Sequence, residues 1–286
     1  MHHRNPIGVA MLAAVLAASS GGARAFDETR YPNWKGMWLR TDTGTPRYDP
    51  TKLMGRPQQA PLTPEAQAFL EASLADQAEG GPGADPTYTC LAPGMPRVMN
   101  NYDGAEFVVT PETVHVLMEH IHDSRRIYTD GRAWPARIEP TPTGYSLGKW
   151  IDEGGTGRYN VLEVETRAFR GPRAYDNSGI PLHEDNESVI KERIFQDTAD
   201  PNILNVEMTT IDHALTRPWT VTKKYRRAQN PRPFWREAVC SESNPHLEIG
   251  KQSYMLSADG HLMPTKKNQP APDLRYFAPP KKDGGK

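Results

Sequence analysis

Apolar and polar residues alternate through the middle of the chain, and turn residues interrupt the alternation at short intervals. In an extended strand, successive side chains point to opposite faces, so this pattern predicts β-strands with one buried face. Eight strands are expected, at 106–110, 113–122, 124–128, 144–150, 159–169, 188–197, 203–211 and 219–226, after an opening strand at 34–39. Such a series favours a closed antiparallel up-and-down barrel, which leaves no strand edge exposed; a two-sheet sandwich is the alternative.

One helix is clearly signalled, and it precedes the main run of strands. Thr63 suits an N-cap, Pro64 suits the first turn, and Gly80-Gly81 ends the segment. Its apolar stripe is expected to lie against the barrel or sandwich, and consists of Ala66, Phe69, Leu70, Ser73 and Leu74. The fold class is therefore mainly β, with one N-terminal flanking helix and a Pro/Lys-rich C-terminal tail.

The first 25 residues are expected to be a signal peptide. Arg4 precedes an apolar run at 7–18, and Ala23-Arg24-Ala25 fits a cleavage site. The run is too short for a resident membrane helix, and no later run is longer; a retained anchor is the alternative. We therefore expect a periplasmic or secreted protein without an integral membrane segment. Its parts would be a strand, helix and linker at 26–105, a barrel at 106–254 and a tail at 255–286.

Charge and cysteine content limit the classes of partner and the kinds of site that the chain can have. The formal net charge is −1, whereas nucleic-acid binding needs a concentrated positive field, so nucleic acid is excluded as the main partner. Cys90 and Cys240 are the two cysteines of the chain. In an oxidising compartment they are expected to form a disulfide, and without a CxxC spacing a zinc site is less favoured.

Several polar residues occupy strand positions that otherwise carry apolar side chains. His120 and His122 continue the face of Val114, Val116 and Met118, so two imidazoles end an apolar row. Such a pair could bind a metal or act as acid and base, although strand-end histidines are most often structural.

Two carboxylates show a related pattern on later strands. Glu192 lies between Ile190 and Ile194, and Asp212 ends the next strand. Glu192 could instead pair across strands with one of three cations, Arg193, Arg126 or Lys224, and Asp212 could cap a turn. The predicted catalytic residues are His120, His122, Glu192, Asp212 and Arg132, and the predicted ligand-binding residues are Arg126, Tyr128, Trp150, His183 and Met208.

Familiar catalytic motifs are missing from the sequence. The cupin metal pattern lacks its glutamate after His-x-His, and there is no G-x-S-x-G, Walker loop or H-E-x-x-H sequence. No cofactor is therefore expected, and no metal ligand is assigned.

Seven ordered motifs resemble those of one family of uncharacterised exported bacterial proteins. The motifs are CLAPGMPRVM at 90–99, RRIYTDGR at 125–132, GYSLGKW at 144–150, VLEVET at 161–166, KERI at 191–194, LTRPWT at 215–220 and VCSESN at 239–244. The resemblance spans most of 33–244 and implies a lipocalin-like β-barrel. It carries over no catalytic residue, cofactor or substrate. Where members have a tight turn, this chain has an insertion at 151–158, which is expected to lengthen a hairpin at the barrel mouth.

The leading functional hypothesis is an exported barrel that binds a small apolar or aromatic molecule. Its cavity would support an acid/base step of the isomerase, lyase or hydratase type. His120 or His122 would be the base, Glu192 or Asp212 would orient it or act as acid, and an arginine would stabilise negative charge. The alternatives are a non-catalytic hydrophobic-ligand carrier or sensor, and a metal-dependent hydrolase using His120, His122 and His183.

Overall fold

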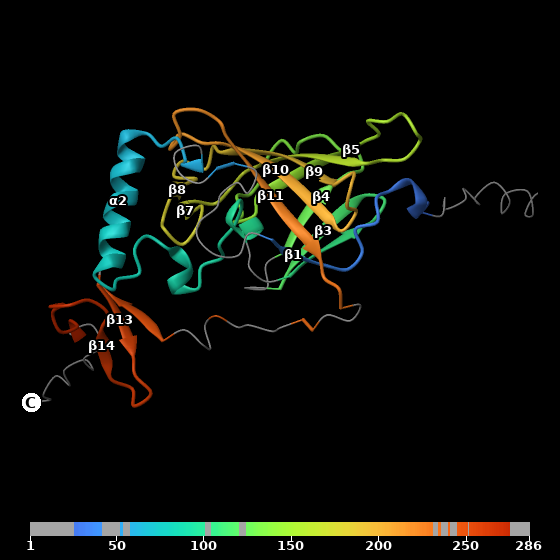
Figure 1. The fold of residues 1–286 in the computed structure, drawn as a ribbon. Helices are drawn as coiled ribbons and strands as arrows, with labels where there is room; N and C mark the ends of the chain where they lie inside the picture. The colour runs from blue at the N-terminus through green and yellow to red at the C-terminus, as the bar shows by residue number, and fades with distance from the viewer. Residues whose placement is uncertain are drawn as a thin grey trace, which may run out of the picture.

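The computed structural model describes residues 26–41, 52–53, 58–100, 104–119, 124–230, 234–235, 240, 245–250 and 252–274. Most of the strands form one barrel, and helix α2 and a small sheet lie beside it (Figure 1). The chain is therefore mainly β, as its alternating pattern predicts.

Nine strands close the barrel in the order β1-β11-β10-β9-β6-β5-β4-β3-β2. Their bounds are β1 (Met37–Arg40), β2 (Ala105–Val109), β3 (Thr113–Met118), β4 (Ser124–Tyr128), β5 (Tyr145–Ile151), β6 (Val161–Arg167), β9 (Val189–Gln196), β10 (Ile203–Ile211) and β11 (Trp219–Arg227). The opening strand β1 completes the closure by pairing with both β11 and β2. The predicted barrel is confirmed, and the sandwich alternative is wrong.

One neighbouring pair departs from the antiparallel order that we expected. Strands β4 and β5 run parallel, with Ile127 opposite Ser146 and Tyr128 opposite Leu147. Parallel neighbours require a crossover rather than a hairpin, and the segment 129–144 supplies it. Three prolines in that segment, which fix φ and do not donate to a sheet, are consistent with its irregular course.

Side chains fill the barrel interior. On β3, Val114, Val116 and Met118 are buried and the residues between them are less so, which confirms the predicted alternation. The core also receives Trp34 from the segment before β1, and this residue is 1 % exposed. Trp34 is therefore part of the barrel core although it precedes the first strand.

Helix α2 (Pro64–Ala78) begins where the sequence predicts, because the Thr63 hydroxyl accepts a hydrogen bond from the Ala66 amide. Its apolar stripe packs less completely than expected. Ala66 and Ser73 are buried, whereas Phe69 is 51 % exposed. The Ser73 hydroxyl donates to the Ser178 carbonyl oxygen at 2.8 Å, so the buried face of this helix consists of small residues.

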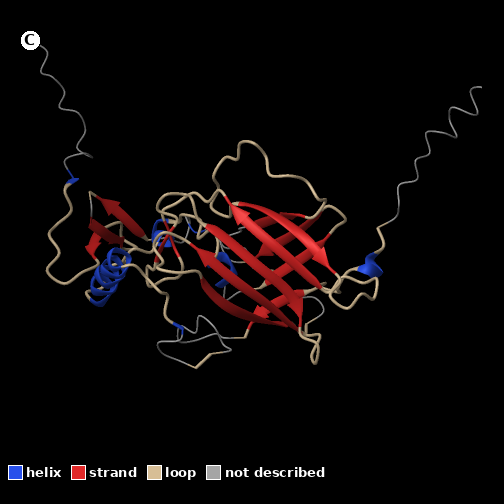
Figure 2. Ribbon diagram, turned by 90° about the horizontal axis from the view of Figure 1, so that it is seen from above, coloured by secondary structure: helices blue, strands red, loops and turns tan. Residues whose placement is uncertain are grey.

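Short elements surround the barrel (Figure 2). They are the 3₁₀ turns η1 (Glu28–Arg30), η3 (Pro86–Thr89) and η4 (Arg97–Asn100), the pair β7 (Arg173–Ala174) and β8 (Pro181–Leu182), and the sheet of β12 (His246–Ile249), β13 (Gln252–Leu256) and β14 (Leu262–Pro264). Strand β14 lies within the part expected to be a tail, so this part contains regular structure.

Cys90 and Cys240 form a disulfide, as predicted, with their Cα atoms 5.5 Å apart. Cys90 directly follows η3, and Tyr88 of η3 contacts His246 of β12 edge to face at 5.1 Å. These contacts connect the small sheet to the segment before the barrel. Among the helices that the structure describes, none is both long and apolar enough to cross a membrane.

Candidate functional site

The segment at 26–36, which we call the N-terminal segment, crosses one end of the barrel. Backbone and side-chain bonds hold it: the Tyr159 amide donates to the Arg30 carbonyl at 2.7 Å, and Arg158 Nε donates to the Thr29 carbonyl at 2.9 Å. On the other side, Gln196 and Arg227 both donate to the Asn33 carbonyl. The segment is thus fixed to the β5–β6 loop and to the ends of β9 and β11.

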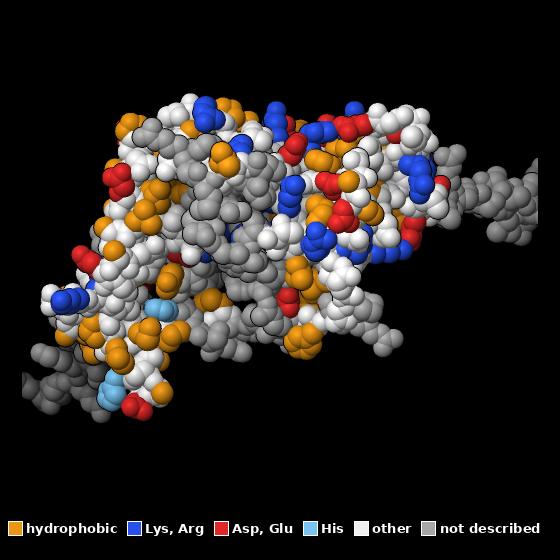
Figure 3. Space-filling view, viewed as in Figure 1, with side chains coloured by type: hydrophobic (Ala, Val, Ile, Leu, Met, Phe, Trp, Pro, Cys, Tyr) orange, Lys and Arg blue, Asp and Glu red, His pale blue; other side chains and the backbone are white. Residues whose placement is uncertain are grey.

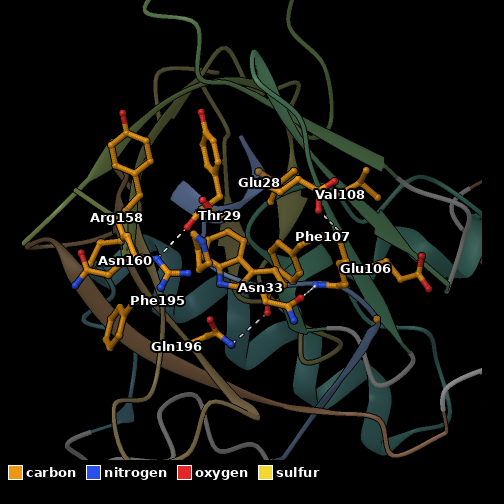
Figure 4. A pocket seen from close by; sticks show the side chains of 18 of the residues that line it. Glu28, Thr29, Asn33, Glu106, Phe107, Val108, Arg158, Asn160, Phe195 and Gln196 are labelled. Atoms are coloured by element: carbon orange, nitrogen blue, oxygen red, sulfur yellow. Dashed lines mark hydrogen bonds and ion pairs between the residues drawn. The ribbon is translucent and has the colours of Figure 1, made fainter. Parts of the chain in front are cut away.

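A groove of about 1100 Å³ lies along this segment, and we call it the mouth groove. In Figure 4, Asn160 and Phe195 lie on one side of the N-terminal segment, and Val108 and Glu106 lie on the other. Small-molecule sites have volumes of about 300 to 1,000 Å³, so the groove is large enough for a drug-sized molecule.

Aromatic rings pack together beside the mouth groove. The Trp34 ring lies 5.1 Å from Trp150 and 5.7 Å from Phe107, and Tyr31 lies 5.3 Å from Tyr159. Trp150, a predicted ligand-binding residue, does not border the groove but packs behind Tyr31 at 5.3 Å. Trp34 and Phe107 are 1 % and 3 % exposed, so these rings pack tightly behind the groove and support its wall.

Charged groups around the mouth groove balance one another. Three carboxylates (Glu28, Glu106 and Glu153) face three cations (Lys35, Arg158 and Arg193). Lys35 pairs with Glu28 at 2.5 Å, and Arg193 pairs with Glu153 at the same distance. Acidic and basic side chains also mix over the barrel face seen in Figure 3. The groove therefore has no strong preference for an anion or a cation.

Tyr31 adds a neutral hydroxyl to this rim. Partial burial raises the pKa of the Tyr31 phenol above its usual value, so the group stays protonated near neutral pH. The phenol can therefore donate or accept a hydrogen bond beside the groove without adding charge.

A second polar group lies inside the barrel and contains the predicted residue Glu192. Its carboxylate forms a two-point ion pair with Arg125, whose Nη1 lies 2.9 Å from Glu192 Oε1. Arg125 also donates to the hydroxyls of Ser146 and Thr166, at 3.2 and 2.8 Å. Both ionic side chains are almost fully buried, so each charge has its partner inside the core.

The partner of Glu192 differs from the three cations that the sequence suggested. Alternation along β4 places Arg125 inward and Arg126 outward, where Arg126 is exposed. Met208, another predicted ligand-binding residue, is buried directly opposite Glu192 in the β9–β10 register. Of the predicted site residues, Glu192 and Met208 are thus neighbours, while Arg126 lies on the other face of the barrel wall.

Asp212 and His183 belong to a third polar group. Asp212 Oδ2 accepts from the Ser188 hydroxyl at 2.5 Å and from the His183 amide at 2.9 Å. The His183 ring is buried, with Nδ1 2.6 Å from the Ser188 hydroxyl and Nε2 2.7 Å from the Met95 carbonyl. Asp212 also caps its own turn by accepting from the Ala214 amide, as the turn interpretation predicted.

Burial fixes the ionisation and the role of His183. It lowers the pKa of the imidazole below its usual value, and the Met95 carbonyl and Asp212 carboxylate offset this shift only in part. The ring is therefore neutral at pH 7. A neutral ring donates from Nε2 to the Met95 carbonyl, and its Nδ1 lone pair lies against the Ser188 hydroxyl at 2.6 Å, so neither nitrogen is open to a metal ion in this conformation.

Arg132 and Tyr128 lie together on the surface. Arg132 pairs with Asp130 at 2.6 Å, and its guanidinium lies 3.9 Å from the centre of the Tyr128 ring. The hydrogen bond from Arg132 lowers the pKa of Asp130. The Asp130-Gly131-Arg132 sequence thus forms a turn with its own internal pairing.

His120 and His122, the predicted bases, lie outside the described residues. Strand β3, which precedes them, begins near the mouth groove, where Val114 pairs with the groove residue Val109. It ends at Met118, which pairs with Ala105 toward the other end of the barrel. The catalytic roles of the two histidines therefore stay predictions.

Three exposed residues, Asp185, Glu187 and His213, place one potential ligand atom each within 4.8 Å of the others. The hydrogen bond to Asp185 raises the pKa of His213. His213 and Asp185 therefore form a surface ion pair when the imidazole is protonated, and this pairing accounts for their proximity.

The candidate site residues named from the sequence did not include the aromatic residues of the N-terminal segment. The available signal was the aromatic density at 26–38, where Phe26, Tyr31, Trp34 and Trp38 occur before the first strand ends. The segment 151–158 was expected to lengthen a hairpin at the barrel mouth, and two of its residues, Glu153 and Arg158, border the groove. Comparison of the chain with protein-family models, curated proteins and solved structures gave no match.

Proposed function

We propose that this protein is an exported barrel that binds a small apolar or aromatic molecule in the mouth groove, as a carrier or sensor. The observation that carries the proposal is a groove of about 1100 Å³ beside packed aromatic rings, with balanced charge at its rim. A preformed, mostly apolar groove with a few polar groups is typical of small-molecule sites.

Binding is favoured over acid/base catalysis by how the described candidates are engaged. Glu192 is paired with Arg125, Asp212 with the Ser188 hydroxyl, and Arg132 with Asp130. These three side chains do not interact with one another, and none of them borders the mouth groove. A general acid or base needs to reach the proton that it transfers, so the geometry supports a binding role.

Export is supported by the Cys90–Cys240 disulfide, because such bonds persist in oxidising compartments. It agrees with the signal peptide expected from the sequence. Secretion or periplasmic retention would both give the protein access to small molecules outside the cytoplasm.

The proposal is tested by titration with N-phenyl-1-naphthylamine, a neutral aromatic probe whose fluorescence rises in apolar surroundings. We expect saturable binding of one probe per chain. Phe195→Ala, which removes a ring from the groove wall, should weaken binding about tenfold or more, because burial of such a side chain contributes 1.5–3 kcal/mol.

The matched control is Tyr145→Ala, which removes a half-buried ring that does not border the groove. We expect the affinity of this variant to stay within about twofold of the wild type, since distant substitutions act independently. Absence of saturable probe binding to the wild type, or an equal loss in both variants, would contradict the proposed function.

A further inference from the structure

We infer that a second site on this protein binds a free amino acid with an apolar side chain, in a pocket between η3, the β7–β8 pair and the small sheet. This pocket, which we call the side pocket, has a volume of about 260 Å³ and shares no lining residue with the mouth groove. Small-molecule sites usually measure about 300 to 1,000 Å³, so the ligand of the side pocket is smaller than a drug-sized molecule. The inference goes beyond the proposed function and is tested separately.

The side pocket contains one cationic side chain, Arg173 of β7, which is half-buried. Its Nη1 donates to the neighbouring Pro172 carbonyl at 2.7 Å, but no carboxylate of a described residue lies within 4.0 Å of the guanidinium. The Nη2 atom makes no hydrogen bond to the described residues and, unlike Nε, is not buried. A guanidinium with an open edge is a donor group that suits a carboxylate.

The surroundings of Arg173 leave its charge without compensation. Burial and the positive charge of Arg170 both lower the pKa of Arg173, and no carboxylate offsets them. An anion that enters the side pocket would stabilise the charged guanidinium, because opposite charges attract more strongly where water is partly excluded.

Two exposed carboxylates, Glu184 and Glu248, border the same pocket. Neither carboxylate forms a hydrogen bond or an ion pair with a described residue. Glu248 shares a face of the small sheet with His246, whose ring contacts Tyr88 of η3 at 5.1 Å. The Glu248 side chain therefore lies on the face of the sheet that is turned toward η3 and the pocket.

The charges of the side pocket favour a zwitterion over a simple ion. Asp85, the third carboxylate of the lining, is already neutralised by Arg97, which binds it at 2.5 and 2.9 Å. One positive and two negative groups thus remain unpaired, more than 4.0 Å apart. A simple anion would be repelled by the two glutamates, and a simple cation by Arg173. A ligand with a carboxylate at one end and an ammonium group beside it pairs with both kinds of group.

Apolar side chains of the side pocket are accessible to a ligand. Phe69 of α2, Tyr88 of η3 and Leu247 of β12 border the pocket and are 51 %, 38 % and 44 % exposed. Hydrophobic side chains gather where α2 meets the small sheet (Figure 3). Four prolines with fixed φ make the wall rigid before a ligand binds, and they are Pro82, Pro86, Pro172 and Pro181. An apolar amino-acid side chain would cover this surface and remove it from water.

Three related probes test the inference on the unaltered protein. L-Phenylalanine carries both charges, L-phenylalaninamide lacks the carboxylate, and N-acetyl-L-phenylalanine lacks the ammonium group. We expect phenylalanine to bind roughly tenfold or more tightly than either derivative in calorimetric or dialysis titrations, because each derivative loses a charge-assisted hydrogen bond.

Arg173→Met keeps an unbranched side chain and removes the charge, so it should abolish the preference for phenylalanine over phenylalaninamide. The matched control is Arg170→Met, an exposed arginine that pairs with Glu139 at 3.8 Å and does not border the pocket; it should retain the preference. At least one of Glu184→Gln and Glu248→Gln should abolish the preference over N-acetyl-phenylalanine. If Arg173→Met does not fold, the three probes decide the question on the wild-type protein.

The inference and the proposed function fail in different ways. No saturable binding of phenylalanine at millimolar concentrations, equal affinities for the three probes, or an unchanged preference in a folded Arg173→Met variant would overturn the inference. Displacement of phenylalanine by N-phenyl-1-naphthylamine would also overturn it, because the amino acid would then occupy the mouth groove. Phenylalanine binding with the expected preferences, but without any binding of N-phenyl-1-naphthylamine, would support the inference and overturn the proposed function alone.

Discussion

Arg125 and Glu192 form the most completely buried ion pair in the part of the chain that the structure describes, at 1 % and 0 % side-chain exposure. Such a pair contributes little compared with apolar side chains of the same size, but removing one partner strands a charge in the core. Its effect on stability is therefore best seen by breaking it.

We expect Glu192→Ala to lower the free energy of unfolding by about 3–5 kcal/mol, because it leaves Arg125 buried and unpaired. The double change Arg125→Met with Glu192→Leu should cost clearly less, since it removes both charges. Urea denaturation measures each value. Arg132→Ala, at the exposed pair with Asp130, is the control and should change stability little. A loss in Glu192→Ala as small as in this control would contradict the assignment.

His183 is expected to make stability depend on pH. Burial lowers its pKa in the folded state below the usual value of 6.5, so folding favours the neutral ring. The folded protein therefore binds fewer protons than the unfolded chain, and the contribution of His183 is present above pH 6.5 and lost progressively below it.

The measurement is the free energy of unfolding between pH 7.5 and pH 5, for the wild type and for His183→Gln. The difference between the two isolates His183 from Asp212, Arg173 and Asp185, which surround it and are present in both proteins. The wild type should lose stability on acidification more steeply than the variant. Parallel pH profiles would show that the ring does not titrate as described.

At the residue scale, the sequence predicted that Glu192 is buried but not which cation meets it. Glu192 stands out because its neighbours on the strand face are isoleucines. Arg125 and Arg126 are adjacent, and a one-residue shift exchanges the face that each occupies. The position of β4 next to β5 settles that choice, and local sequence does not specify it.

Among the elements, the loop between β5 and β6 and the N-terminal segment together build the groove. Loop residues Glu153 and Arg158 border it, and the Arg158 bond to the Thr29 carbonyl fixes the segment. Surface loops tolerate changes in length at small cost in stability, so the loop can be altered without loss of the barrel.

We expect replacement of 153–158 by Asn-Gly to reduce affinity for N-phenyl-1-naphthylamine at least several-fold, because it removes part of the groove wall and a tether of the N-terminal segment. The melting temperature should change little. The control inserts two glycines into the turn between β13 and β14, which lies outside the groove. Unaltered affinity in the shortened variant would argue that the ligand binds elsewhere.

Strand positions were predictable from alternation, whereas strand partners were not. Each of the eight predicted strands occurs within a few residues of its expected place, because one buried face imposes a period of two. The parallel β4–β5 pair and the sheet β12–β14 were not predicted. The former depends on the path of the crossover at 129–144, and the latter consists of short strands with weak alternation.

For the whole molecule, the disulfide connects two parts that are 150 residues apart in sequence. In the chain-entropy model, closing so long a loop stabilises the folded state by about 5 kcal/mol, an upper value. The bond also holds the C-terminal sheet near η3, where Tyr88 meets His246.

We therefore expect the double variant Cys90→Ser, Cys240→Ser to lose protection from hydrogen exchange in β12–β14 first. The barrel strands should remain protected, and affinity for the probe should be retained, because the groove lies on the barrel. Exchange followed by mass spectrometry separates the two regions. Equal loss of protection in the barrel and the small sheet would contradict this division.

The largest difference between expectation and structure is the location of the groove, which lies at one end of the barrel and not in its interior. Polar residues on apolar strand faces suggested a cavity inside the barrel, but Arg125 and Glu192 satisfy each other and the surrounding side chains fill the interior. The groove arises because Tyr31 and Trp34 enter from a segment outside the main strands. Where that segment packs depends on tertiary contacts with the β5–β6 loop, β9 and β11, which no local pattern encodes.

A crystal structure of the protein with N-phenyl-1-naphthylamine bound would locate the ligand site directly. We expect electron density for one molecule between the N-terminal segment and the wall formed by Phe195 and the β5–β6 loop. Density inside the barrel beside Glu192, or at His183, with an empty mouth groove, would contradict it.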